Sequence, residues 1–241
     1  GLMRLGKWIK IFRKAGVQSA VMCGGVTKSK MYPNAARLLP DVRSAKVWYR
    51  NARSREDHTL LEDVVEEADI FVTATGGVVE EFEKEGIRIE SSVLFCPQLL
   101  APAGCLTPRE PSEREWADIR FAWPLGKQIA GMQIGQTIVA KDGAVIAVEG
   151  MDGTDATLRR GGQIAQGGAV AVKLAKEGYD PRFDIPCIGA DTVDVLQQAG
   201  ISALAVEAGN TIALDRDEIA RKASPADISV VALTPEDVAA A

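Results

Sequence analysis

The sequence has a single histidine, His58, among its 241 residues. This scarcity excludes a zinc site built from three histidines, and a Ser-His-Asp triad would have to use that one residue. The four cysteines are widely spaced and form no C-x-x-C pair, which favours reduced thiols in the cytoplasm over a disulfide framework. No apolar run approaches the roughly 18–20 residues that cross a bilayer, and no secretory signal pattern opens the chain. A basic surplus is also lacking: the net charge is −5 and the pI about 5.1, so we expect no general affinity for nucleic acid.

What is present is ordinary globular composition, with 46% apolar and 25% charged residues. In the first half, helical spacing over residues 4–15 precedes a short apolar strand at 19–22. A second apolar strand at 68–75 precedes an acidic helix at 78–85. This alternation predicts an α/β layer with a mainly parallel sheet. Because a doubly wound domain normally opens with a strand, we expect this one to lack its first strand.

The pattern changes at residues 102–112, where three prolines predict a linker. The predicted domains are therefore 1–108 and 109–241. A helix follows from about Glu113, and Pro124 should kink or break it. Next, two apolar strands around Lys141-Asp142-Gly143 predict a hairpin. The remaining pattern predicts a second α/β or α+β domain, with strands at 169–174, 203–206, 211–214 and 228–233 and helices at 190–199 and 215–223.

Acidic residues gather where the hairpin ends and a helix begins at Thr154 or Asp155. Glu149, Asp152 and Asp155 would lie at a strand end and a helix N-terminus. That position suits metal-bound carboxylates and phosphate, because free backbone N–H groups point outward there. The alternative is a helix start surrounded by solvated acids.

A second polar segment, residues 173–186, carries cations next to aspartates. Lys173, Lys176 and Arg182 are natural counter-charges for a pyrophosphate. Asp180 and Asp184 could hold Mg²⁺ or orient an attacking water. A charged loop of surface ion pairs is the alternative.

Two further features allow a functional or a purely structural interpretation. The glycines between 161 and 168 could approach a phosphate, but they lack the GK[ST] of a P-loop, and ordinary loop flexibility is the alternative. The helix at 4–15 places Trp8 and Phe12 among basic residues, Arg4, Lys7, Lys10 and Arg13. It could touch an acidic membrane surface or simply pack with a solvated basic face.

An ordered set of segments carries a family resemblance. The segments are Val148-Glu-Gly-x-x-Gly-Thr-Asp155, Val172-Lys-Leu-Ala-Lys176, Asp180-x-Arg-Phe-Asp-x-Pro186 with Ile188-Gly189, and Ala205-Val-Glu-Ala-Gly209, preceded by Ile134-Gly135-Gln136. Together they resemble the LpxI-type UDP-2,3-diacylglucosamine pyrophosphatases of bacterial lipid A synthesis. The resemblance implies an N-terminal Rossmann-like domain, a C-terminal domain and an acylated sugar nucleotide between them. It also implies pyrophosphate hydrolysis with Mg²⁺, giving UMP and 2,3-diacylglucosamine 1-phosphate, by a cytoplasmic homodimer in peripheral contact with the inner membrane.

Roles for individual residues follow from the resemblance and the local chemistry together. We expect the catalytic residues to be Asp184, Asp155 and Asp180. The expected metal ligands are Asp184, Asp155 and Glu149. The expected substrate-binding residues are Lys173, Lys176, Arg182, Thr154 and Gln136. We further expect Glu149, Asp155, Lys173, Arg182 and Asp184 to converge in space.

Three departures from the family pattern affect the N-terminal half. The opening strand with its glycine-rich loop has no counterpart, His58 stands where a second aspartate is usual, and residues 67–79 resemble an insertion. The missing N-terminal segment is the main support for one competing hypothesis, a non-catalytic nucleotide-lipid binding or regulatory protein derived from such an enzyme.

Overall fold

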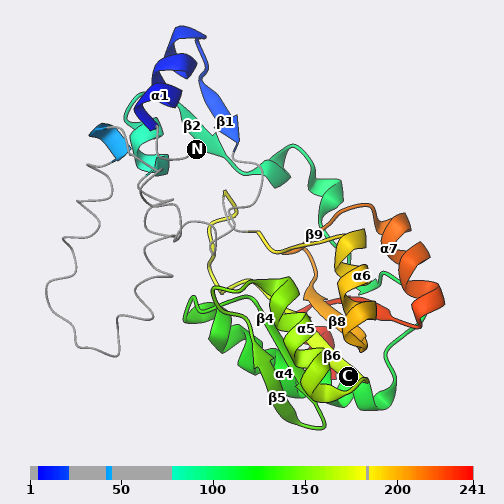
Figure 1. Ribbon diagram of the computed structural model, residues 1–241. Helices are drawn as coiled ribbons and strands as arrows, with labels where there is room; N and C mark the ends of the chain where they lie inside the picture. The colour runs from blue at the N-terminus through cyan, green and yellow to red at the C-terminus, as the bar shows by residue number, and fades with distance from the viewer. Residues whose placement is uncertain (1–4, 22–41, 45–77, 183–184, 241) are drawn as a thin grey trace, which may run out of the picture. The chain divides into compact units, whose positions relative to one another are not determined.

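The computed structural model describes residues 5–21, 42–44, 78–182 and 185–240. The chain forms two compact units, each considered by itself: unit 1 is Gly1–Phe95 with Pro181–Phe183, and unit 2 is Cys96–Asp180 with Asp184–Ala241 (Figure 1). The α/β class predicted from the sequence is confirmed. The strand predicted at 68–75 lies outside the described residues. No helix in the described ranges is long and apolar enough to span a membrane.

A mixed six-stranded sheet in the order β3-β10-β8-β6-β4-β5 forms the centre of unit 2. Its strands are β3 (Gly104–Cys105), β4 (Thr137–Lys141), β5 (Ala144–Val148), β6 (Ala169–Lys173), β8 (Ile201–Glu207) and β10 (Ser229–Leu233). The central strands β6, β8 and β10 are parallel, whereas β3, β4 and β5 run antiparallel to their neighbours. A small parallel pair, β7 (Cys187–Ile188) and β9 (Ile212–Ala213), forms a separate sheet.

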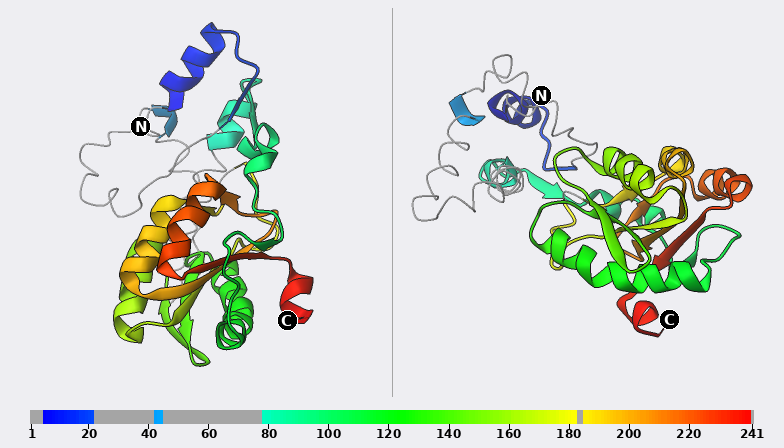
Figure 2. Two further views of the ribbon diagram at one scale, coloured as in Figure 1. Left: turned by 90° about the vertical axis from the view of Figure 1, so that its right-hand side faces the viewer. Right: turned by 60° about the horizontal axis from the view of Figure 1, so that its bottom comes forward.

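Helices cover both faces of the large sheet (Figure 2). One face carries α4 (Glu113–Gly131) and α8 (Pro235–Ala240), and the other carries α5 (Thr154–Ala165), α6 (Ala190–Ala199) and α7 (Arg216–Ala223). Along β6, Val170 and Val172 pack in the core under α4, whereas Ala169 and Ala171 pack in the core under α5 and α6. Strands buried on both faces explain why these segments are continuous apolar runs.

The hairpin prediction is confirmed, because β4 and β5 pair antiparallel around a two-residue turn. Asp142 and Gly143 both have positive φ, 52° and 70°, which is the conformation that a type I′ turn requires. The predicted break at Pro124 does not occur, since α4 continues through it. Buried Trp123 and Gly126 on either side of the proline hold both halves of α4 against the sheet.

Within residues 102–112, where a linker is predicted, Gly104–Cys105 forms the edge strand β3 of the sheet. β3 pairs with β10, and Leu106 N donates to the carbonyl of Val230 at 2.8 Å. In return Val230 N donates to Thr107 Oγ1 at 2.9 Å. Prolines are tolerated at such an edge because few ladder hydrogen bonds are needed there.

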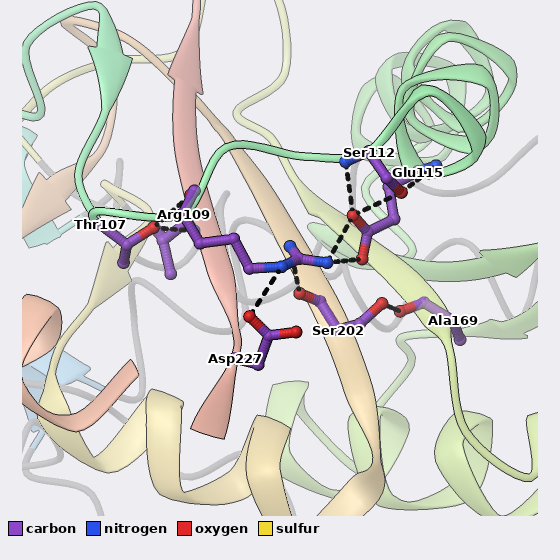
Figure 3. A network of polar contacts seen from close by, with 8 residues as sticks. Thr107, Arg109, Ser112, Glu115, Ala169, Ser202 and Asp227 are labelled. Atoms are coloured by element: carbon purple, nitrogen blue, oxygen red, sulfur yellow. Dashed lines mark hydrogen bonds and ion pairs between the residues drawn. The ribbon is translucent and has the colours of Figure 1, made fainter. Parts of the chain in front are cut away.

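Arg109 fastens this edge to the start of α4 (Figure 3). Its guanidinium donates to both carboxylate oxygens of Glu115 at 2.8 Å and pairs with Asp227 at 3.2 Å. Glu115 also accepts from the backbone N–H of Ser112 at 2.7 Å, which completes a capping box. Burial alone would raise the pKa of Glu115, but the hydrogen bonds from Arg109, Ser202 and Ser112 outweigh it and lower that pKa to about 2.

The first two glycines of the 161–168 stretch have a packing role that neither sequence interpretation anticipated. Both lie inside α5. A Cβ at Gly161 would come within 2.8 Å of the Val139 side chain, and one at Gly162 within 1.9 Å of the Ala199 carbonyl oxygen. These glycines therefore let α5 approach β4 and the end of α6.

Unit 1 packs α1 (Leu5–Lys14) on the parallel pair β1 (Ser19–Val21) and β2 (Arg88–Glu90), with a helical segment at 78–83. These bounds match the predicted helices and the predicted strand at 19–22. Buried Leu5 and Ile9 meet Phe82 in its core. Trp8 and Ile11, also on α1, each expose about half of their side chains.

Candidate functional site

Polar side chains of unit 2 gather at the end of the large sheet where the parallel strands stop. We call this end the sheet edge, as distinct from the edge strand β3. Lys173 ends β6, Glu149 directly follows β5, and Glu207 ends β8. Because β4 runs antiparallel to β6, its first residue, Thr137, lies at the same edge and pairs in register with Lys173. Ligand sites of open α/β sheets lie outside the carboxyl ends of the parallel strands.

A chain of hydrogen bonds joins three of the predicted site residues. The Lys173 ammonium donates to Thr154 Oγ1 at 2.6 Å, and that hydroxyl donates to the Glu149 carboxylate, with both oxygens at 3.2 Å. The buried Thr137 hydroxyl lies 3.5 Å from the same Thr154 oxygen. Thr154 thus accepts from a cation and donates to an anion, which fixes the direction of its single hydroxyl proton.

Close backbone contacts hold this cluster in place. Glu149 N donates to the carbonyl of Thr137 at 2.8 Å. A Cβ at Gly135 would lie 2.2 Å from the carbonyl oxygen of Glu149, so only glycine allows the two segments to approach this closely. Lys173 is 7% exposed, and its charge opposes the burial that raises the pKa of the Cys187 thiol on β7.

The first turn of α5 adds positive potential to the Lys173 ammonium. Its N-cap is Gly153, with φ of 83° and no side-chain cap. The N–H groups of this turn therefore have no capping side chain, and an uncapped helix N-terminus attracts anions. Asp155 lies in the same turn and is exposed. In the loop before α5, Asp152 forms an ion pair with Arg160, which helps to lower the pKa of that carboxyl group against its desolvation.

A second cluster, at the same edge but on the α4 face, was missed by sequence reasoning. Lys127 donates to both carboxylate oxygens of Glu207 at 2.7 Å and to the carbonyl of Ala175 at 3.1 Å. Tyr179 lies nearby, and burial followed by the Glu207 charge raises the pKa of its phenol. One sequence signal could have found this cluster: Glu207 ends an otherwise apolar strand within the Ala205–Gly209 segment.

The remaining predicted residues are distributed as follows. Lys176 and Asp180 are half-buried in the segment after β6, and the carbonyl of half-buried Gln136 accepts from Leu174 N at 2.8 Å. Arg182 belongs to unit 1, where it pairs with Glu83 at 2.9 Å. Asp184 lies outside the described residues. The structure therefore brings Glu149, Thr154 and Lys173 together, and the wider convergence with Arg182 and Asp184 stays a prediction.

The predicted metal ligands can be tested only in part. Within the described ranges, no group of three or more His, Cys, Asp or Glu side chains is arranged to hold a metal ion. Glu149 and Asp155 are the two predicted ligands in these ranges, and they supply the carboxylate oxygens that Mg²⁺ prefers. A complete set would need Asp184 or another donor.

Comparison with known proteins finds similarity along the whole chain. The family model of the LpxI C-terminal domain matches residues 102–231, and that of the LpxI N-terminal domain matches residues 1–71. The UDP-2,3-diacylglucosamine pyrophosphatase LpxI of Caulobacter vibrioides is 30% identical over 247 residues, which cover 98% of this chain and 82% of that protein. The bifunctional purine biosynthesis protein PurH of Bacillus anthracis is 29% identical over 153 residues, covering 61% of this chain but 24% of that protein.

Proposed function

The chain belongs to the LpxI family, and we propose that it hydrolyses the pyrophosphate of UDP-2,3-diacylglucosamine to UMP and 2,3-diacylglucosamine 1-phosphate in lipid A biosynthesis. The observation that carries this proposal is the 30% identity to the UDP-2,3-diacylglucosamine pyrophosphatase LpxI of Caulobacter vibrioides over 98% of the chain. The polar cluster at the sheet edge gives the reaction a physical basis.

The pyrophosphate is the part of the substrate that this cluster suits best. An acidic protein binds such a dianion only through local positive charge, which Lys173 and the uncapped start of α5 supply. Lys176 and Arg182 are the further cations that we propose for phosphate binding, and Gln136 is the proposed amide contact. Thr154 holds the Lys173 ammonium in one position, so the charge is placed before substrate arrives.

The proposed hydrolytic residues are the aspartates that flank these cations. Asp155 is exposed at the start of α5, and Asp180 is half-buried after β6. With Asp184, they are the carboxylates that would orient and deprotonate the attacking water. Asp184 is our first choice because it lies in the family segment Asp180–Pro186.

We propose that activity also requires Mg²⁺, with Glu149, Asp155 and Asp184 as its ligands. A divalent ion would neutralise charge that develops on the cleaved pyrophosphate. We further propose a cytoplasmic homodimer in peripheral contact with the inner membrane. The half-exposed Trp8 and Ile11 on α1, next to the basic Lys10, support that contact, because such a face combines apolar and positive character.

The decisive experiment is a turnover assay of the purified chain on acylated UDP-glucosamine, with UMP as the measured product. We expect UMP release with Mg²⁺ and its loss in excess chelator. Lys173→Met provides the site variant, and Lys222→Met, which removes an ion pair with Asp194 remote from this sheet edge, provides the matched control. Substrate binding without UMP release would reject the enzyme and support the nucleotide-lipid binding protein instead.

A further inference from the structure

We infer that Lys127 and Glu207 are positioning residues that hold the segment 174–180, and with it Lys176 and Asp180, in the geometry that hydrolysis needs. This inference rests on the proposed function, because it concerns a segment that we assign to phosphate binding and water activation. Neither residue is among those expected to contact the substrate. Both act through the backbone that follows β6.

The two charges form a closed polar unit between α4 and β8. Glu207 is 5% exposed, and both of its carboxylate oxygens accept from the Lys127 ammonium at 2.7 Å. The third interaction of this ammonium is to the carbonyl of Ala175 at 3.1 Å. All three donor directions of the lysine are therefore used, and one of them fixes the chain directly after β6.

The segment 174–180 is fastened at both of its ends. At the beginning, Leu174 N donates to the Gln136 carbonyl at 2.8 Å, and Ala175 is held by Lys127. Toward the other end, the Tyr179 hydroxyl donates to Asn210 Oδ1 at 3.4 Å. The Glu207 charge contributes to the raised pKa of the Tyr179 phenol. Lys176 lies between these attachments, and Asp180 follows directly.

Close packing makes the attachment rigid. A Cβ at Gly126, the residue before Lys127, would lie 3.1 Å from the side chains of Leu174 and Val172. The helix therefore runs close to β6 where Lys127 reaches across. Replacing a buried charge pair by apolar groups of similar volume is often neutral for stability, so the effect of this pair on the segment can be measured apart from folding.

The test uses the double variant Lys127→Met with Glu207→Met, which replaces both charged side chains together by apolar ones of similar volume. We expect near wild-type thermal stability, a kcat lower by roughly tenfold to a hundredfold, and a smaller change in KM. Independently of activity, amide hydrogen exchange over residues 175–180 should become faster. The control is Arg109→Met with Glu115→Met, which removes another bidentate pair of unit 2, at the capped start of α4 and away from this sheet edge. That control should lose stability while the kcat of its folded fraction stays unchanged.

Three results would overturn the inference. The first is unchanged exchange over 175–180 in the Lys127/Glu207 variant. The second is faster exchange with unchanged kcat, because the segment would then be held for another reason. The third is an equal fall in kcat for the control pair, which would indicate a general effect of destabilisation. If the wild-type protein itself releases no UMP, the proposed function fails, and the exchange measurement still decides whether this pair holds the segment.

Discussion

The Lys173 ammonium lies 2.6 Å from the hydroxyl of Thr154, although nineteen positions separate the two residues in the chain. The contact joins the end of β6 to the first residue of α5. It places a buried positive charge at a helix start that already attracts anions. Removing the hydroxyl should therefore affect the proposed activity more than it affects folding.

We predict that Thr154→Val lowers kcat/KM about tenfold to a hundredfold. The variant keeps the shape but loses the acceptor for Lys173 and the donor to Glu149, so the ammonium is no longer held in one position. Thr154→Ser restores both hydrogen bonds and should recover most of the activity. Steady-state kinetics of the two variants, with UMP release as the readout, make the comparison. Equal activity of the valine and serine variants would contradict a role for the hydroxyl.

Glu115 makes the stability of unit 2 depend on pH in the acidic range. Its pKa is about 2 in the folded protein against 4.5 for the ordinary group, so the folded state favours the ionised form. The resulting stabilisation, about 3 kcal/mol, is complete above pH ~4.5 and is lost as the pH falls from there toward 2. Urea denaturation between pH 3 and 7 should show this loss for the wild type.

The Glu115→Gln variant is the test of that assignment. It should be less stable than the wild type at pH 7 by about 3 kcal/mol, and the difference should shrink as the pH falls below ~4.5. Glu113→Gln, an exposed change in the same helical turn, should alter stability by about 0.5 kcal/mol. A pH-independent difference between wild type and Glu115→Gln would assign the stabilisation to packing rather than to the charge.

Two helical glycines should respond in opposite directions to the same change. Gly162→Ala introduces a Cβ that would lie 1.9 Å from the Ala199 carbonyl oxygen, so we expect a loss of about 2 kcal/mol or more. A Cβ at Gly131 meets nothing within 4 Å, so Gly131→Ala should stabilise α4 by up to about 1 kcal/mol. Thermal denaturation of both variants measures the difference, and similar melting temperatures would contradict the close approach of α5 and α6.

Much of unit 2 could be predicted from the sequence because local signals and burial agree there. The helix at 190–199 and the strands around 169–173 and 229–233 are continuous or periodic apolar segments with clear ends. The edge strand at Gly104–Cys105 could not be predicted, because two residues carry no periodicity and their pairing with β10 is a long-range contact. The same holds for Gly161 and Gly162, whose role depends on neighbours distant in sequence.

Site residues could be predicted where their own segment also shows the element end that places them. Glu149, Thr154 and Lys173 lie at element ends that the sequence marks, and the structure brings them together. Lys127 gave no such signal, since a lysine on a helix is usually solvated, and its partner lies 80 positions away. Long-range charge pairing of this kind is decided by the packing of α4 on the sheet, which a single sequence does not specify.

The remaining prediction concerns Asp184, the residue that we propose as the main hydrolytic carboxylate. Asp184→Ala should abolish turnover while substrate binding stays largely intact, because uridine contacts, the phosphate cations and the acyl groups do not need this carboxylate. Loss of a negative charge near the pyrophosphate should leave affinity equal or slightly higher. Asp184→Asn keeps the shape and tests the charge alone.

The measurements are single-turnover rate and equilibrium binding for both variants. A rate loss of roughly a hundredfold, about 3 kcal/mol, with unchanged binding is expected for an interaction made in the transition state. Equal losses in rate and binding would instead make Asp184 a binding or structural residue, and the catalytic assignment would pass to Asp155 or Asp180.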